Sequence, residues 1–419
     1  MPKRVLKVVQ RQATKVSRPP SASLPLLRWI EPIKAMAILA VVIVHVQAAM
    51  YDRTPWVLQA SRELPNLWER LDLILPPHES IWLTIAHSLS MLGGNAPGVF
   101  IVVSGLTLAW SALHAKQDAE WLKQFYVRRA LRIFPFYIAA HVIDLLLAAF
   151  LPGAQLQLEW PQAFLSLLGL RFTSELFSYF DPAWWFIWLI LQLYLVFPAL
   201  LWILRRAGIP MFLAVTLGIT FACRIWVVQS VDDVQHWRMG ITFVSRLAEF
   251  SVGMAVAQWV FTHRRELAGP VAAHTVRQFF LWSLGTYIAG LLAQTTLAGT
   301  VMSALLVSVG MTGIFWCLAE LVLPRQPILA STMRWIGLHA YGIYLLHFLP
   351  FKWMVDLYPG SPRTQLLAFL AVFAGACFCA WLMELSIGPF LRARHRPTTR
   401  PVGFSAARAG QRRALLGSQ

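Results

Sequence analysis

The first apolar segment contains two basic residues, Lys34 and His45, whose side chains and spacing are suited to a catalytic site. They are eleven positions apart, which at about 100° per residue is roughly 20° more than three full helical turns. On a helix they therefore share one face, separated by roughly 16 Å along the axis. An ionisable residue inside a membrane helix predicts a functional site, and a neutral imidazole can act as a general base. The alternative is a structural histidine that hydrogen-bonds a neighbouring helix.

A second basic group, Arg128, Arg129 and Arg132, directly precedes another apolar segment. Residues three and four apart are neighbours on a helix, so the guanidinium groups would form one cationic surface. Arginine binds phosphate in a bidentate manner, and the cluster therefore predicts a site for a phosphate-bearing cofactor. The alternative is ordinary anchoring of a cytoplasmic loop by basic residues.

Further polar side chains lie inside or against apolar segments. Arg246 and Glu249 are three positions apart, a spacing at which a base and an acid can neutralise each other. His347 ends the sequence Tyr344-Leu-Leu-His347, near the expected outer end of an apolar segment. The remaining residues of this kind are Ser104, Asp144, Gln192, Glu320, His339 and Glu384.

The composition predicts the class of protein that must position these residues. The chain has 419 residues, of which 58% are hydrophobic and 13% are charged, whereas soluble domains carry about 25% charged residues. This indicates an all-α, polytopic integral membrane protein. The net charge of +17 is concentrated in the tails and short loops, so it indicates membrane topology and not nucleic-acid binding. The four cysteines show neither disulfide nor metal-site spacing, and no metal is expected.

About ten transmembrane helices are expected, because a span needs about 20 predominantly apolar residues. Together they form a membrane domain over residues 33–387, between a basic segment at 1–32 and a basic tail at 388–419. The shorter apolar segments 81–92 and 161–172 are expected at the interface, and 52–80 and 152–183 are the longest outer loops. The predicted spans are 33–51, 95–113, 133–151, 184–204, 209–228, 241–261, 278–297, 299–322, 333–351 and 364–387.

The distribution of basic residues predicts the orientation. With the N-terminus inside, the cytoplasmic segments hold 27 Lys and Arg residues and the opposite segments hold 8, so both termini are predicted to be cytoplasmic. The first span and the small residues Ala48 and Ala49 imitate a cleavable signal peptide. Because the basic region is long for such a peptide, residues 35–51 are interpreted as a retained signal anchor.

Six short motifs occur in order between residues 34 and 347. They are Lys34 with His45, Gly98 to Ser104-Gly105, Arg129-x-x-Arg132 with Pro135 and Tyr137, Trp185 to Gln192-Leu-Tyr194 and Pro198, Arg246 to Glu249 and Gly253, and Tyr341-Gly-Ile-Tyr344-Leu-Leu-His347. Together these motifs resemble the membrane acyltransferase 3 family of O-acyltransferases. Lysine stands at position 34, in Glu31-Pro-Ile-Lys34, where the family commonly has arginine in Asp-Gly-x-Arg. It keeps the charge but lacks the bidentate fork.

The resemblance implies transfer of an acyl group, usually acetyl, from acyl-coenzyme A to a hydroxyl of a cell-surface glycan or lipid-linked saccharide. It implies a protein of the bacterial cytoplasmic membrane, in contact with its lipids. His45 would take the proton of the acceptor hydroxyl or pass the acyl group onward, and Lys34 would order the entrance below it. Arg129 and Arg132, with Arg128 beside them, would hold the phosphates of coenzyme A. Substrate contact or support would fall to Ser104, Tyr194, Arg246, Glu249, Tyr344 and His347.

Other functions remain open at this level. A polytopic bundle with intramembrane charges is also typical of a transporter or flippase for a glycan or lipid, although no paired repeats or matched broken helices are visible. A lipid-linked glycosyltransferase is a third possibility, but the cytoplasmic loops show no Asp-rich metal site. The donor could equally carry a succinyl group.

Overall fold

The computed structural model describes residues 25–51, 69, 92–150, 159–231, 236–348 and 362–394, and every element in these ranges is helical. The expected interfacial segment 81–92 and the outer loop 52–80 lie outside the described residues, apart from Glu69 and Leu92. The longer helices are α3 (Ile30–Tyr51), α6 (Pro97–Leu113), α7 (Ala119–Phe150), α10 (Trp185–Ser230), α12 (Leu247–Thr262), α13 (Ala273–Gln294), α14 (Thr300–Val322), α15 (Pro327–Leu346) and α17 (Pro362–Arg394). Shorter elements include η1 (Leu92–Asn95), α8 (Trp160–Leu167), α9 (Ser174–Phe177), a π-helical turn η3 (Trp237–Ile241) and η4 (Phe243–Arg246).

A helix occupies the position of each of the ten predicted spans, although several bounds differ. α7 begins at Ala119, so it carries the arginine cluster on the same helix as the predicted span. α12 begins only at Leu247, after the 3-10 turn η4, so Arg246 is at the helix N-cap and not inside a span as the sequence predicted. α10 joins two predicted spans. By length and hydropathy, three helical stretches among the described residues can cross a membrane: Gly93–Leu113, Pro182–Ser230 and Thr300–Arg325.

The junction inside α10 is at Gly208, where φ is 74° and ψ is 172°. A positive φ is costly for a residue with a Cβ atom and almost free for glycine. The chain therefore changes direction between residues 204 and 209, where the sequence predicts the break between two spans.

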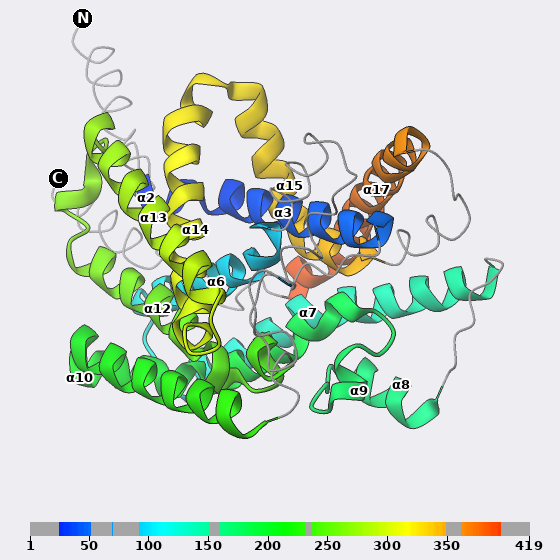
Figure 1. Cartoon of the computed structure of the whole chain (residues 1–419), viewed down its shortest axis with the longest axis horizontal. Helices are drawn as coiled ribbons and strands as arrows, with labels where there is room; N and C mark the ends of the chain where they lie inside the picture. The colour runs from blue at the N-terminus through cyan, green and yellow to red at the C-terminus, as the bar shows by residue number, and fades with distance from the viewer. Residues whose placement is uncertain are drawn as a thin grey trace, which may run out of the picture.

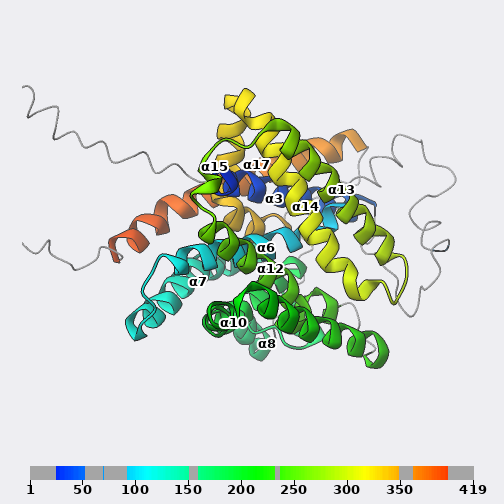
Figure 2. The same ribbon diagram turned by 90° about the vertical axis from the view of Figure 1, so that its left-hand side faces the viewer.

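The helices form one bundle around α3 (Figures 1 and 2). α3 packs against α15, α14 and α6, while α12 lies between α6 and α10. α13 and α14 lie side by side, and α10 lies at the bottom of both views. This arrangement places the helix that carries Lys34 and His45 in the interior of the bundle.

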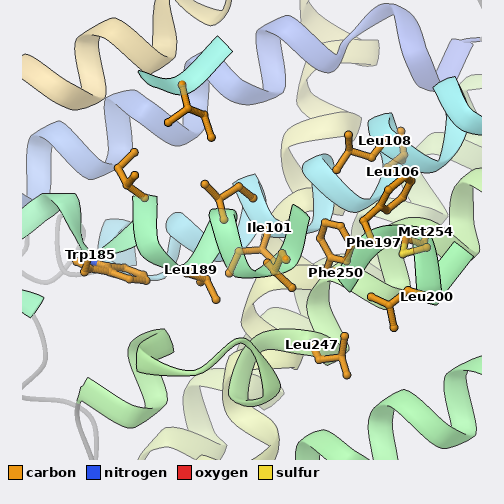
Figure 3. Packing of buried hydrophobic residues seen from close by; sticks show 14 of the residues in the cluster. Ile101, Leu106, Leu108, Trp185, Leu189, Phe197, Leu200, Leu247, Phe250 and Met254 are labelled. Atoms are coloured by element: carbon orange, nitrogen blue, oxygen red, sulfur yellow. The ribbon is translucent and has the colours of Figure 1, made fainter. Parts of the chain in front are cut away.

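A buried apolar cluster joins α6, α10 and α12 (Figure 3). Ile101, Phe197, Phe250 and Met254 are each fully buried in it. The rings of Phe197 and Phe250 meet edge to face with centroids 6.2 Å apart, within the range that aromatic pairs prefer. The cluster fixes the position of α10 relative to α6.

The crossing of α6 and α12 depends on small residues. Gly105 and Ala109 on α6, and Gly253 and Ala257 on α12, are all buried. Each pair has the four-residue spacing that lets membrane helices approach closely. A Cβ atom at position 253 would lie 2.0 Å from the Val102 carbonyl oxygen, so the two backbones are in direct contact.

We therefore expect Gly253→Ala to lower the free energy of unfolding by about 1–3 kcal/mol, the usual effect of overpacking a tight interface. The matched control is Gly285→Ala on α13, because a Cβ atom there meets nothing within 4 Å. That change should be neutral or stabilising by up to about 1 kcal/mol, from helix propensity. Thermal unfolding of the detergent-solubilised variants measures both, and equal melting temperatures would contradict the close crossing.

Candidate active site

A cavity of about 140 Å³ lies among α3, α6, α7, α10 and α15. Apolar and aromatic side chains form most of its wall, as is typical of ligand pockets. The predicted site residues that line it are Lys34, His45, Ser104, Arg132, Tyr194 and Tyr344. The tertiary structure thus brings together residues from five helices that are far apart in the chain.

α3 runs along this cavity and supplies a polar group towards each end. Lys34 forms an ion pair with Glu31, with Nζ and Oε2 2.5 Å apart, and lies close enough to Arg132 for their charges to interact. His45 lines the same cavity, as the eleven-residue spacing predicts, roughly 16 Å further along the helix. The cavity therefore has a cationic end and a histidine end.

His45 is hydrogen-bonded to the fully buried His347. His45 Nδ1 lies 2.7 Å from His347 Nε2, and the rings stack with centroids 4.9 Å apart. His347 Nδ1 lies 2.7 Å from the Tyr344 carbonyl oxygen. Because a carbonyl oxygen only accepts, His347 Nδ1 must donate, and a neutral His347 then accepts at Nε2. His45 Nδ1 is the donor, which leaves His45 Nε2 as the nitrogen that can take a proton.

The three arginines of the cluster differ in their position relative to the cavity. Arg132 lines the cavity and is also exposed, so it can meet a ligand from solvent. The Arg129 guanidinium lies 5.6 Å from the ring centroids of both Phe125 and Tyr194, and its buried Nε has no hydrogen-bond partner among the described residues. Arg128 donates to the Gln124 Oε1 atom at 3.1 Å and does not contribute to the described cavity wall.

Arg246 and Glu249 lie outside this cavity, in a buried ion network at the start of α12. Their ion pair has a distance of 3.2 Å from Arg246 Nη1 to Glu249 Oε1. Arg224 binds the same carboxylate through both oxygens, at 2.8 and 3.0 Å, and donates Nε to the Ser245 carbonyl at 2.7 Å. Sequence reasoning missed Arg224, although an arginine inside the apolar segment 209–228 was a signal for it.

Arg171, which was also not predicted from the sequence, supports the cavity wall near Tyr344. The fully buried Arg171 donates to Ser166 Oγ at 2.8 Å and to the Tyr179 carbonyl at 2.7 Å, with further bonds to Tyr137 Oη and the Leu176 and Phe177 carbonyls. These bonds hold the segment 166–179 against α7. That segment leads directly into Ala183 and Trp185, which line the cavity.

Asp181 connects this segment to the start of α10. Its Oδ1 accepts a hydrogen bond from the Ala183 backbone N–H at 2.6 Å. Burial raises the pKa of Asp181 to about 7, opposed by that hydrogen bond and by the charge of Arg171. Tyr344 Oη donates to the Ala183 carbonyl, and Trp184 Nε1 donates to the Leu345 carbonyl at 3.0 Å. These bonds join the end of α15, which His347 caps, to the cavity wall.

Comparison with known protein families gave a match over most of the chain. A family model described as "Acyltransferase domain", from the acyltransferase 3 family, matches residues 27–385. This range includes all of the cavity and nearly the whole predicted membrane domain. No curated protein and no solved structure matched the chain. The chain belongs to the acyltransferase 3 family, and the protein is a membrane acyltransferase.

Proposed function

We propose that this protein transfers an acyl group, most simply acetyl, from acyl-coenzyme A to a hydroxyl of a glycan or lipid-linked saccharide. The observation that carries the proposal is that one cavity is lined by Arg132 and Lys34 towards one end and by His45 towards the other. Cationic groups suit the phosphates of coenzyme A, and the imidazole suits proton transfer from a hydroxyl.

The proposed setting is a ten-span bundle in a bacterial cytoplasmic membrane, with both termini cytoplasmic. Support comes from the helices at all ten predicted positions and from the 27-to-8 distribution of basic residues. In this orientation the Arg132 end of the cavity faces the cytoplasm, where acyl-coenzyme A is available. His45 then lies in the outer half of the membrane, nearer to an external or lipid-linked acceptor.

His45 Nε2 accepts the proton of the acceptor hydroxyl in the proposed reaction. As that O–H bond breaks, the oxygen attacks the thioester carbonyl carbon and forms a tetrahedral intermediate. When the intermediate collapses, the C–S bond breaks, and the proton held by His45 passes to the leaving sulfur. The products are an ester on the acceptor and free coenzyme A. His347 keeps the His45 proton on Nδ1 throughout, through the contact of 2.7 Å.

The other lining residues position the donor. Tyr194 lies beside Arg129 at the inner end of the cavity, with 5.6 Å from the guanidinium carbon to the ring centroid. Ser104 and Tyr344 also line the cavity wall. Because the Tyr344 hydroxyl already donates to the Ala183 carbonyl, its role is to shape the cavity.

Donor binding tests this proposal. We expect Arg132→Ala to raise the dissociation constant for acetyl-coenzyme A about 10- to 100-fold, because it removes hydrogen bonds from a charged donor that contribute about 1.5–3 kcal/mol. Calorimetry on the purified protein measures the constant. Arg206→Ala is the matched control, since that guanidinium lies over the Trp202 ring, away from the cavity.

Two results would count against the proposal. Equal affinity of the wild type and Arg132→Ala would remove the assigned phosphate site. A wild type that binds no acyl-coenzyme A, but moves saccharide across proteoliposomes without it, would make the protein a transporter.

A further inference from the structure

A second, smaller cavity of about 50 Å³ adjoins the first. The two share Gly94, Pro97 and Trp185. Trp185 begins α10, nine residues or about 13 Å before Tyr194, which contacts Arg129. The second cavity therefore lies at the end of the first that is remote from the proposed coenzyme A phosphates.

Half of the residues that line this second cavity are polar. It contains two arginines, two amides and two hydroxyls, and none of its described residues is acidic. Gln294 Nε2 donates to Asn95 Oδ1 at 3.0 Å, and Ser303 Oγ donates to the Thr300 carbonyl at 3.1 Å, so the orientation of these groups is fixed. The six polar residues are Asn95, Arg238, Arg246, Gln294, Ser303 and Ser308.

The charge of Arg246 is only partly compensated by its acidic neighbour. Both oxygens of Glu249 are bound by Arg224, and Arg246 reaches one of them, at 3.2 Å. The buried Arg246 Nε has no hydrogen-bond partner among the described residues, and an unsatisfied buried donor of this kind is costly. An anionic ligand in the cavity would satisfy it.

Arg238 brings a further positive charge to the same wall. Burial, together with the charges of Arg224 and Arg246, lowers the pKa of Arg238 to about 10. Arg238 is thus close enough to Arg224 and Arg246 for the three positive charges to repel one another. A bound carboxylate or phosphate between Arg238 and Arg246 would reduce this repulsion and accept bidentate hydrogen bonds.

We propose that this second cavity binds an anionic group, a carboxylate or a phosphate, carried by the saccharide acceptor. Arg238 and Arg246 hold the anion, and a hydroxyl of the same saccharide extends past Trp185 into the adjoining cavity that contains His45. The substrate class is therefore an acidic or phosphorylated saccharide. This inference rests on the proposed acyl transfer to a saccharide.

The test is binding of small saccharides to the purified full-length protein, measured as a shift in melting temperature over a range of ligand concentrations. Glucuronate and glucose 1-phosphate are the anionic probes, and glucose and inorganic phosphate are the controls. We expect the anionic sugars to stabilise the wild type and glucose to have no effect. Arg238→Gln should weaken the response to the anionic sugars about 10- to 100-fold, while Arg206→Gln should leave it unchanged.

A second variant covers the case in which Arg238→Gln does not fold. Ser303→Asp introduces a carboxylate on the cavity wall, so it should abolish binding of the anionic sugars by repulsion. Binding of acetyl-coenzyme A should be unchanged in both variants, because its site is at the other end of the first cavity.

The outcomes separate the two proposals. Equal responses to glucose and glucuronate, or anionic binding that neither variant affects, would overturn the anion site while acetyl-coenzyme A binding still supports acyl transfer. A response to inorganic phosphate as strong as that to glucose 1-phosphate would remove the saccharide from the inference. Anionic-sugar binding that depends on Arg238, without any binding of acyl-coenzyme A, would support the site and contradict the proposed enzyme reaction.

Discussion

Replacing His45 with glutamine is expected to reduce acyl transfer by about 10²- to 10⁴-fold, the contribution usual for a positioned general base. Glutamine can still donate a hydrogen bond to His347 Nε2, which lies 2.7 Å from the His45 ring, but it cannot take the acceptor proton. The affinity for acetyl-coenzyme A should remain near that of the wild type. Transfer of label from acetyl-coenzyme A to the glycan of an acceptor-competent host, at equal protein abundance, measures the effect.

Substitution of His347 is expected to reduce acyl transfer less than substitution of His45. The His347 ring contacts His45 and the Tyr344 carbonyl, so His347→Gln should lower kcat about tenfold while KM for acetyl-coenzyme A is unchanged. His339→Gln, on α15, is the matched control, because His339 does not line the cavity. Among the described residues its side chain hydrogen-bonds only the Trp335 carbonyl, at 2.8 Å. If His45→Gln retained full activity, His45 would be structural and the base would be elsewhere.

Glu249→Gln is expected to lower the free energy of unfolding by about 3–5 kcal/mol, as removal of one partner from a buried ion pair commonly does. The Glu249 side chain is fully buried, and its carboxylate binds Arg224 through both oxygens and Arg246 through one. Without the negative charge, two guanidinium groups would remain buried without compensation. Denaturation in mixed detergent micelles measures the change.

The matched control for this change is Glu120→Gln at the start of α7. Glu120 is exposed and accepts a hydrogen bond from Gln124, so its removal should cost at most about 1 kcal/mol. The double variant Arg224→Met/Glu249→Gln should lose less stability than the sum of the single changes, since it removes both buried partners. Similar losses for Glu249→Gln and Glu120→Gln would show that the network contributes little.

Much of this protein follows from local sequence. Runs of apolar residues determine the helices, because a helix satisfies its backbone hydrogen bonds within one segment. The turn of a helix also places Lys34 and His45 on one face without reference to any other part of the chain. The same regularity makes Arg129 and Arg132 neighbours, and the break at Gly208 was visible as the gap between two apolar runs.

The tertiary structure determined which side chains meet across the bundle. The contact of His45 with His347 joins residues 302 positions apart, and neither its existence nor the resulting tautomer follows from the sequence pattern. The contacts of Arg224 with Glu249, and of Arg171 with several backbone carbonyls, likewise depend on how the helices pack. Such contacts depend on the rotation and depth of each helix, which close contacts such as that of Gly253 with Val102 decide.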